Sequence, residues 1–319
     1  MNKVFSDDPH SAELMDHVKR EDMIVFVGSG LSAGEGGYPA WWELVEKLRM
    51  HCGLDDEPPV TKHTSANRLQ ELAQKARDKD PTCYVSVLQA DFAKTVLNTR
   101  RAYDLLLRSP FVGYVTTNFD PLLAIALAAN NSAKKIHAYP ELDHLELRSK
   151  TAFYLHGYIA EGSTPVPERI VLCKDDFEAA YDPQCGPLPL FWESLLRQCP
   201  VLFLGCNLGE PELEFIFTRC NSVRTALEQK YGIQAKKRFV LLPPSEEIKT
   251  VKTRDEDIVN NAAKVEADSL ARFEKYDITV VRYDPKDRRY SGLIEVLQEW
   301  ARVPSVEVYT YNSGDIPYE

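Results

Sequence analysis

A glycine-rich segment carries the first residues whose types and spacing could bind a ligand. It follows the apolar run 23–27 and contains Gly28, Ser29, Gly30 and Ser32. Glycines permit positive φ and let backbone amides approach a phosphate closely. A helix that we expect to begin near Pro39 would add its positive N-terminal end. A tight turn that binds nothing is the alternative, but the strand before the segment and the helix after it favour a phosphate site.

A second polar group follows the apolar run 112–116. It contains Thr117, Asn118 and Asp120, and Pro121 comes next. Ligands of open α/β sheets bind at the carboxyl ends of strands. Asn118 offers a hydrogen-bond donor and an acceptor, and Asp120 offers a carboxylate. Helix capping is the alternative and explains Asp120 alone better, because Asp is a favoured N-cap and proline a favoured first helical residue. Asn118 is less easily explained as a cap.

Two more expected strands end in residues that could do chemistry. His156 ends the run 153–156, and histidine titrates near neutral pH without help. A hydrogen-bonded histidine at the rim of the core is the usual alternative for a lone residue of this kind. The run 201–204 leads into Gly205 and Asn207. These two form either a simple βα turn or a second cradle, for the adenosine half of a dinucleotide.

The glycine spacing does not fit a dehydrogenase. Gly28, Gly30 and Gly34 only loosely resemble G-x-G-x-x-G, and no acidic residue follows at the end of a clear second strand. Dehydrogenases use that acidic residue to bind the ribose of NAD. Hydride transfer is therefore a poor interpretation.

The elements that must position these residues alternate between strands and helices. The apolar runs lack polar alternation, which is typical of strands covered on both faces of a parallel sheet. The expected strands are residues 23–27, 112–116, 153–156, 169–172, 201–204, 238–242 and 278–282. The expected helices are residues 39–51, 67–77, 84–97, 121–129, 187–198, 212–231, 257–275 and 291–301. This alternation predicts a doubly wound, Rossmann-like α/β fold with a parallel sheet.

Residues 41–108 show helical patterns and no good strand, which is more than one crossover connection needs. We therefore expect a helical insertion that forms a smaller module within one domain of residues 1–304. The tail, residues 305–319, is polar and rich in tyrosine. We expect it to be an extension that docks on a neighbouring molecule.

Composition and charge disfavour several classes of protein. The 319 residues carry a formal net charge of -10, which disfavours non-specific binding to nucleic acid or to anionic membranes. The 7 cysteines include no C-x-x-C pair, so neither a disulfide framework nor a paired-cysteine metal site is expected. No apolar stretch reaches the roughly 18 residues of a membrane span, and the first residues lack the apolar core of a signal peptide. We expect a soluble cytoplasmic protein without a bound metal.

Taken together, the four segments and their order resemble the sirtuin superfamily. The shared motifs are the glycine segment, T-T-N-F-D at residues 116–120, His-Gly at residues 156–157 and F-L-G-x-N at residues 203–207. Gly37, Pro39 and Trp41, with F-L-G-C-N-L-G-E-P-E-L at residues 203–213, are more similar to the bacterial sirtuin-like NADases of anti-phage defence, such as the Thoeris effector. The resemblance runs from about residue 23 to residue 300. The chain lacks the four-cysteine zinc ribbon of the deacylase branch, which favours NAD hydrolysis over deacylation.

The resemblance implies an NAD glycohydrolase that releases nicotinamide and ADP-ribose and depletes NAD in anti-phage defence. It implies that Asn118 and His156 are the catalytic pair and that Asp120 supports them. The residues implied in holding NAD are Gly28, Ser29, Gly30 and Ser32 at the pyrophosphate, Gly205 and Asn207 at the adenosine ribose, and Pro39, Trp41 and Thr117.

Such an enzyme must be restrained in the cell, so we expect a homo-oligomer or a defence-system partner protein. Two alternatives stay open. One is an NAD-dependent protein deacylase or ADP-ribosyltransferase. The other is a non-catalytic nucleotide-binding sensor or assembly subunit, although the presence of both Asn118 and His156 argues against it.

Overall fold

A seven-stranded parallel sheet forms the centre of the molecule. The computed structural model describes residues 8–94, 101–130, 135–243, 256–284, 286 and 291–303. The strands are β1 (Ile24–Val27), β2 (Gly113–Thr116), β3 (Ile136–Ala138), β4 (Ala152–Tyr154), β5 (Val201–Leu204), β6 (Arg238–Leu242) and β7 (Thr279–Arg282). Their order across the sheet is β3-β4-β2-β1-β5-β6-β7. This topology confirms the predicted doubly wound, Rossmann-like α/β fold.

Helices occupy most connections between the strands. The predicted helices in the structure are α3 (Trp41–His51), α4 (Ala66–Lys79), α5 (Pro81–Phe92), α7 (Leu122–Ala129), α9 (Pro187–Gln198), α10 (Pro211–Tyr231), α12 (Glu256–Lys275) and α13 (Ser291–Trp300). The sequence patterns do not predict α1 (Ser11–Lys19), α2 (Ser29–Gly36), α6 (Arg101–Arg108) or α8 (Lys174–Ala180). Glycine has a low helix propensity, and α2 contains three glycines. Its composition therefore predicts a loop.

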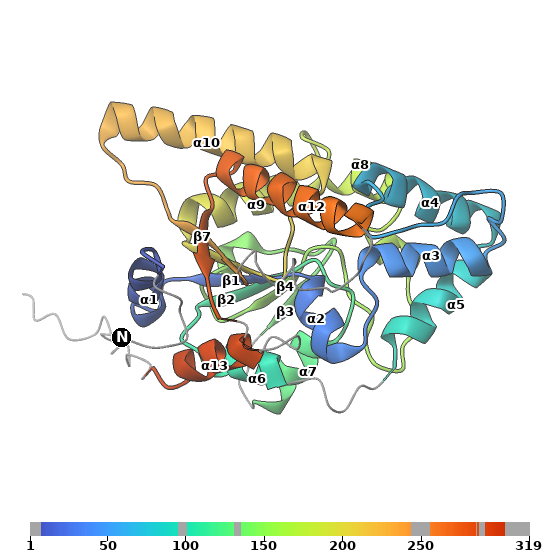
Figure 1. The fold of residues 1–319 in the computed structure, drawn as a ribbon, viewed down its shortest axis with the longest axis horizontal. Helices are drawn as coiled ribbons and strands as arrows, with labels where there is room; N and C mark the ends of the chain where they lie inside the picture. Colours follow the sequence, from blue (N-terminus) through green and yellow to red (C-terminus); the bar gives the residue numbers. More distant parts are fainter. Residues whose placement is uncertain are drawn as a thin grey trace, which may run out of the picture.

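Both faces of the sheet are covered by helices, and each face has its own core. Figure 1 shows α6, α7 and α13 on one face and α9, α10 and α12 on the other. Val25 and Val27 of β1 belong to the first core, whereas Ile24 and Phe26 belong to the second. Successive strand residues point to opposite faces, so every residue of such a strand is buried in apolar surroundings. This explains why the strands lack polar alternation.

The prediction of a strand at residues 169–172 is wrong. Residues Pro167–Arg169 form a short 3-10 helix (η2), and the segment that follows is irregular. The Val171 amide donates to the His156 carbonyl at 3.0 Å. The run is apolar because it is buried, and a short apolar run does not distinguish a strand from another buried segment. The three-residue edge strand β3 was not predicted, because it contains a central histidine and is too short to show a pattern.

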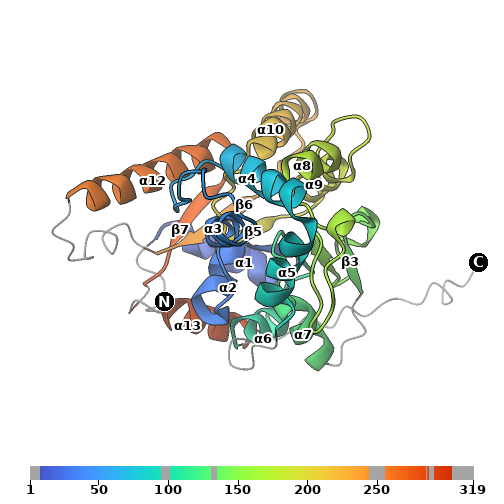
Figure 2. The same cartoon turned by 90° about the vertical axis from the view of Figure 1, so that its right-hand side faces the viewer.

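Helices α3, α4 and α5 pack against one another beyond the carboxyl ends of the strands (Figures 1 and 2). Helix α4 also contacts α8, whereas α6 packs against α7 and α13. Residues 41–108, the predicted insertion, therefore place helices in two parts of the molecule. The predicted tail, residues 305–319, lies outside the described residues.

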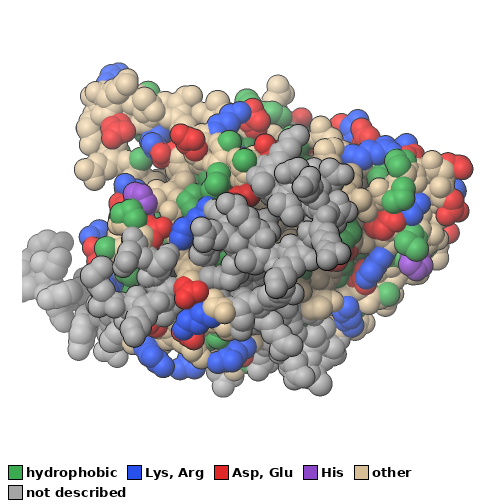
Figure 3. Space-filling view, viewed as in Figure 1, with side chains coloured by type: hydrophobic (Ala, Val, Ile, Leu, Met, Phe, Trp, Pro, Cys, Tyr) green, Lys and Arg blue, Asp and Glu red, His purple; other side chains and the backbone are tan. Residues whose placement is uncertain are grey.

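The surface carries charges of both signs. On the face seen in Figure 3, acidic and basic side chains are interspersed over the helices at the right of the view. Within the part of the chain that the structure describes, no helix is both long and apolar enough to cross a membrane.

Candidate active site

The carboxyl ends of β1, β2, β4 and β5 bring the four predicted segments to one edge of the sheet. Val27 lies beside Thr116 on one side and beside Leu204 on the other. Thr116 in turn lies beside Tyr154. The segments that follow these residues therefore leave the sheet next to one another. Ligand sites of open α/β sheets form at this edge.

Helix α2 begins immediately after β1, with Gly28 as its N-cap. The helix predicted to begin near Pro39 is present as α3, which begins at Trp41, but the prediction missed α2, which comes before it. The N-terminus that faces the edge of the sheet is that of α2. Partial positive charge at a helix N-terminus favours an anion, so the predicted phosphate position moves to the first turn of α2.

Two amides of this first turn already donate hydrogen bonds to carbonyls at the end of β5 and in the turn that follows it. The Gly28 amide donates to the Leu204 carbonyl at 2.8 Å, and the Gly30 amide donates to the Gly205 carbonyl at 3.0 Å. The Ser29 amide has no acceptor among the described residues. Of these three amides, that of Ser29 is the one available to a ligand.

The glycines of the two turns allow backbone to pack on backbone. A Cβ at Gly28 would lie 2.4 Å from the Gly205 carbonyl oxygen, and one at Gly30 would lie 2.9 Å from the same oxygen. Gly205 has a φ of 64°, a conformation that favours glycine. Gly28 has a φ of -98° and Gly30 is helical. Neither of these two glycines therefore uses the positive φ that glycine permits, and both are required by close packing.

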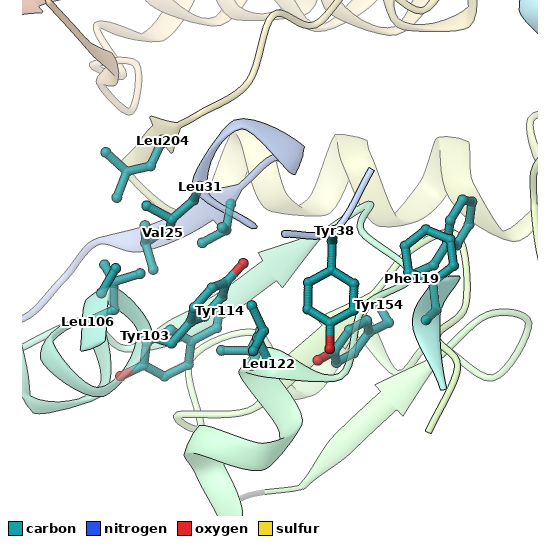
Figure 4. Close-up of a cluster of buried hydrophobic side chains, with 14 of the residues drawn as sticks. Val25, Leu31, Tyr38, Tyr103, Leu106, Tyr114, Phe119, Leu122, Tyr154 and Leu204 are labelled. Atoms are coloured by element: carbon teal, nitrogen blue, oxygen red, sulfur yellow. The ribbon is translucent and has the colours of Figure 1, made fainter. Parts of the chain in front are cut away.

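The side chain of Asn118 is buried within a hydrogen-bond network. Its Nδ2 donates to Ser32 Oγ at 3.0 Å, and Ser32 Oγ donates to Asp120 Oδ2 at 2.7 Å. The Tyr103 hydroxyl lies 2.6 Å from Ser32 Oγ. Since the Ser32 proton is used on Asp120, Tyr103 donates to Ser32. Figure 4 shows the buried cluster in which Tyr103 lies, together with Leu31 of α2.

This network leaves one atom of Asn118 unsatisfied. With Nδ2 directed at Ser32, Oδ1 is a buried acceptor that has no partner among the described residues. A buried acceptor without a partner costs free energy, and most such atoms in proteins are satisfied. A hydroxyl group of a ligand in the cavity beside Asn118 would satisfy it.

Asp120 is buried, and its two carboxylate oxygens accept hydrogen bonds from different parts of the chain. Its Oδ1 accepts the Leu122 amide at 3.1 Å and so caps the first turn of α7, while its Oδ2 accepts from Ser32. Burial raises the pKa of Asp120 to about 6, because the charged carboxylate loses water; the bonds from Ser32 and Leu122 oppose this rise. The carboxylate is therefore mainly ionised at neutral pH and titrates well above the range of an ordinary aspartate.

His156 lies two residues beyond β4 and is buried. Its Nε2 lies 3.0 Å from the Tyr181 hydroxyl, and its ring packs edge-on against Phe177 at 5.1 Å. Burial lowers the pKa of His156 to about 3. The imidazole is therefore neutral at neutral pH, and a neutral imidazole has one nitrogen that can accept a proton or a hydrogen bond.

Two adjoining cavities include all the predicted site residues among their lining. The smaller cavity, of about 90 Å³, is lined in part by Ser29, Ser32, Pro39, Trp41, Thr117, Asn118, Asp120 and His156. The larger cavity, of about 810 Å³, is lined in part by Gly28, Ser29, Gly30, Trp41, Thr117, Gly205 and Asn207. Ser29, Trp41 and Thr117 line both. The two cavities together form one continuous candidate site.

Asn207 is exposed, and Arg272 of α12 holds it. The Arg272 Nη1 donates to the Asn207 carbonyl at 2.7 Å and lies 3.3 Å from Asn207 Oδ1. Arg272 also lines the larger cavity. It places a positive charge where a phosphate or a ribose could accept a hydrogen bond.

Glu210 lines both cavities and precedes the first residue of α10. Burial raises the pKa of its carboxyl group. When ionised, a carboxylate at the junction of the cavities can stabilise positive charge that develops beside it. The sequence pattern indicates only a helix start here, because Glu210 precedes a proline.

Motif spacing also misses Tyr103, Tyr181 and Arg272, which contact predicted site residues. Tyr103 lies on α6, and Arg272 lies near the end of α12. Tertiary packing brings each of these residues to its contact from a distant part of the sequence. Residues 171–181, which end at Tyr181, are also similar to the sirtuin-like NADases, and this resemblance is the one signal in the sequence that could have identified Tyr181.

All 7 cysteines are free. The described residues contain no group of three or more His, Cys, Asp or Glu side chains that could hold a metal ion.

The sequence is similar to a family of protein domains over part of this site. The family profile described as a SIR2-like domain matches residues 112–280, which is more than half of the chain. The matched region contains Thr117, Asn118, Asp120, His156, Gly205 and Asn207.

Several curated relatives are similar over longer or shorter parts of the chain. NAD(+) hydrolase ThsA of Bacillus cereus (strain MSX-D12) is 27% identical over 214 residues, and that of Acinetobacter baumannii (strain 532279) is 26% identical over 221 residues. These alignments cover 66% and 68% of this chain but only 42% of each relative. Defense-associated sirtuin 2 of Bacillus subtilis is 23% identical over 90% of this chain and 26% of the relative. The chain thus spans less than half the length of these relatives.

Among solved structures, a crystal structure of a Sir2 homolog–NAD complex is similar to this chain. The two are 13% identical in sequence, with 95% of each chain covered and a TM-score of 0.42.

Proposed function

Because the chain belongs to the family of SIR2-like domains, we propose that it cleaves NAD between nicotinamide and ribose, giving nicotinamide and ADP-ribose. The names of the relatives, NAD(+) hydrolase and defense-associated sirtuin, support this reaction and a role in bacterial anti-phage defence. The observation that carries the proposal is that Asn118 and His156 line one small cavity. A larger cavity beside it has room for the rest of the dinucleotide.

The reaction requires no strong acid, because nicotinamide leaves from a pyridinium ion. The bond between ribose C1′ and the nicotinamide nitrogen breaks, and its electron pair neutralises the pyridinium ring. The ribose becomes an oxocarbenium-like cation, to which water adds before it loses one proton. The site must therefore orient the ribose, stabilise positive charge and accept a proton.

Asn118 is proposed to orient the ribose or the attacking water. Its unsatisfied Oδ1 can accept a hydrogen bond from a hydroxyl group, and this bond removes the cost of a buried acceptor. Ser32 and Tyr103 are positioning residues in this proposal, because they fix the direction of the amide. This assigns Ser32 a role different from the predicted contact with the pyrophosphate.

His156 is proposed to accept the proton of the water or of a ribose hydroxyl. Its imidazole is neutral, which is the form that a base requires, and Tyr181 holds Nε2 at 3.0 Å. Asp120 and Glu210 place carboxylates around the same cavity. They are proposed to stabilise the developing positive charge of the ribose.

The pyrophosphate is proposed to lie at the first turn of α2. The Ser29 amide and the helix N-terminus supply the binding groups there, while Gly28 and Gly30 allow the turn to pack against Gly205. Arg272, Gly205 and Asn207 line the part of the larger cavity proposed for the adenosine ribose.

An enzyme that consumes NAD needs restraint, so we propose that a homo-oligomer or a defence-system partner controls it in the cytoplasm. Residues 1–304 are proposed to form the catalytic domain, with residues 41–108 as its helical insertion. The packing of α3, α4 and α5 beyond the strands supports the insertion.

Incubation of the purified chain with NAD, with and without candidate activators, tests the function. No acylated peptide is added to this reaction. Chromatography should then detect nicotinamide and ADP-ribose in equal amounts. Cleavage only with an acyl-lysine peptide would favour a deacylase. NAD binding without cleavage under every condition would favour a nucleotide sensor, and either result would overturn the proposal.

A further inference from the structure

A separate cavity of about 520 Å³ lies between α9, α10 and the segment that leads into β6. It shares no lining residue with the two cavities of the candidate active site. Arg238, the first residue of β6, lines it. The cavity therefore lies at the amino ends of the strands, at the edge of the sheet opposite to the active site. Its volume is within the range of about 300–1,000 Å³ that is usual for small-molecule sites.

The cavity is lined by basic residues in a chain whose net charge is acidic. Its lining contains Arg197, Arg224, Lys236 and Arg238 but only one acidic residue, Glu193. The Glu193 carboxylate is 3.1 Å from Arg219 Nε, so a cation outside the cavity already pairs with it. Arg197 and Lys236 are exposed, and among the described residues neither has an ion pair. The cavity therefore has an excess of positive charge.

Arg238 is the buried part of this group, with 2% of its surface exposed. Its described hydrogen bonds are to uncharged groups, the Asn221 Oδ1 at 2.6 Å and the Tyr276 carbonyl at 2.8 Å. Its guanidinium lies over the Phe217 ring at 5.4 Å. Burial lowers the pKa of Arg238 to about 10, so the side chain remains charged at neutral pH. The Asp277 carboxylate also attracts this guanidinium, but it forms its ion pair with Arg224. A buried charge without an ion pair of its own is costly.

Two donor atoms of these arginines remain unsatisfied. Arg224 Nε and Arg238 Nε are buried and have no hydrogen-bond partner among the described residues. Asp277 pairs with Arg224 through Nη1, which leaves the Nε atom unused. An anion in the cavity would compensate the buried charge and could accept hydrogen bonds from these donors.

Most of the remaining lining is apolar, with Ser194, Gln198 and Gln234 as the uncharged polar residues, so the ligand needs an apolar part as well as an anionic group. The apolar lining consists mainly of Leu190, Leu196, Val223, Leu227, Ile233 and Ala235. Leu190 and Ile233 are 57% and 53% exposed and line this cavity together with Val223, and grouped exposed apolar side chains are typical of a ligand-binding groove. We propose that this cavity binds a small organic anion in which one phosphate or carboxylate group is joined to an apolar body.

Naphthyl phosphate is a suitable probe, with naphthol and inorganic phosphate as controls that lack the charge or the apolar body. Calorimetric titration of the intact chain should show saturable binding of naphthyl phosphate and much weaker binding of both controls. No saturable binding of naphthyl phosphate at millimolar concentration would overturn the proposal. Equal binding of naphthol would also overturn it, because the cavity would then be only an apolar hollow.

Variants of exposed residues locate the site without disturbing the fold. Arg197→Gln/Lys236→Gln should weaken binding by about tenfold or more, since two charged donors are lost. The control Lys19→Gln/Arg108→Gln removes the same charge from exposed positions on α1 and α6, outside the cavity lining, and should bind like wild type. Equal affinity in the two double variants would overturn the assignment.

A tryptophan on α10 separates this cavity from the phosphate position at α2. Val223→Trp fills the cavity and should abolish binding, whereas Ala226→Trp, on the same helix but outside the lining, should not. Probe binding is measured directly, so this test does not depend on the proposed enzymatic activity. Nicotinamide release in the absence of the probe should be the same in both variants. Undiminished binding to Val223→Trp would place the probe elsewhere and overturn the proposal.

Discussion

The orientation of Asn118 depends on two hydroxyl groups that no short motif marks. Tyr103 donates to Ser32, and Ser32 donates to Asp120, so the Ser32 oxygen can only accept from Asn118 Nδ2. The amide oxygen is consequently directed away from the network and remains without a partner among the described residues. A ligand hydroxyl thus meets a prearranged acceptor.

Asn118→Ala should reduce NAD cleavage by about 100- to 1000-fold while NAD still binds. The loss follows from removing the group proposed to orient the ribose, whereas the first turn of α2 is unchanged. Nicotinamide release measures the first effect and calorimetric titration with NAD measures the second. Wild-type turnover in this variant would disprove the catalytic assignment of Asn118.

Ser32→Ala should lower kcat by about 100-fold with little change in KM, because the amide of Asn118 loses its fixed orientation. Tyr103→Phe removes a single hydroxyl from the same chain of bonds and should give a smaller loss of kcat. If Ser32 instead binds the pyrophosphate, Ser32→Ala will raise KM and leave kcat intact, and Tyr103→Phe will have no effect.

Asp120 should make the protein less stable as the pH rises, which is the opposite of the usual effect of an aspartate. Its pKa is about 6 in the folded chain and about 3.9 in an unfolded chain. Because its pKa is raised by folding, the Asp120 carboxyl binds its proton more tightly in the folded chain than in the unfolded chain. Protonated Asp120 therefore stabilises the folded state fully below about pH 4, and this stabilisation is lost as the pH rises through 6.

The difference in the free energy of unfolding between wild type and Asp120→Asn measures this contribution. It should change by about 2 kcal/mol between pH 4 and pH 7, with wild type relatively less stable at the higher pH. Denaturant unfolding at several pH values provides the measurement. A difference that does not vary with pH would show that the Asp120 carboxyl has an ordinary pKa.

At the scale of single residues, sequence spacing predicts which residues line the cavities but not what their side chains do. The strand–turn pattern predicts that Asn118 and His156 lie at strand ends, and both line the smaller cavity. The glycine motif predicts Ser32 at the pyrophosphate, but its hydroxyl is buried and bonded to Asp120. That bond joins α2 to the end of β2, and a local pattern carries no information about such a distant partner.

At the scale of elements, the turns after β1 and β5 act as one unit. Gly28 and Gly30 lie against the backbone of Gly205, and two amide–carbonyl hydrogen bonds join the turns. The sequence predicts both turns from their glycines. It misses their mutual packing and the immediate start of α2, because glycine propensity indicates a loop while tertiary contacts stabilise a helix.

Gly28→Ala should destabilise the protein by about 1–3 kcal/mol, because the new methyl group meets the Gly205 carbonyl and Cys206. The neighbouring substitution Ser29→Ala changes an exposed residue of the same turn and should alter the free energy of unfolding by less than about 0.5 kcal/mol. Thermal or denaturant unfolding compares the two. Equal stabilities would mean that the turns do not pack closely in solution.

At the scale of the whole molecule, few polar contacts connect α4 to the rest of the structure. Arg77 of α4 pairs with Asp176 of α8 at 2.6 Å, and Gln70 donates to Glu212 of α10 at 3.1 Å. These contacts connect the α3–α5 group to the helices that cover the sheet. The sequence predicts the group of helices, but which helices it contacts depends on pairs of residues far apart in the chain.

Arg77→Leu should increase amide exchange in α3–α5 by about fivefold and leave the sheet unchanged, since a partly buried ion pair contributes on the order of 1 kcal/mol. Arg68→Leu is the matched control, because Arg68 pairs with Glu57 and Glu71 near or within α4 itself. Hydrogen–deuterium exchange with mass spectrometry provides the measurement. Equal exchange in the two variants would show that the Arg77 pair does not hold the group in place.

The position of β1 at the centre of the sheet has a consequence for protein synthesis. Ile24 pairs with Gly113 on one side and with Val201 on the other. A ribosome adds about 5–20 residues per second, so the turn at Gly28 exists for roughly ten seconds or more before Gly205 is made. In the last part of that time the nascent chain has Asn118 and His156 but not the backbone against which α2 packs. Under the proposed function, a ribosome-bound chain therefore cannot consume NAD until β5 and its turn have emerged.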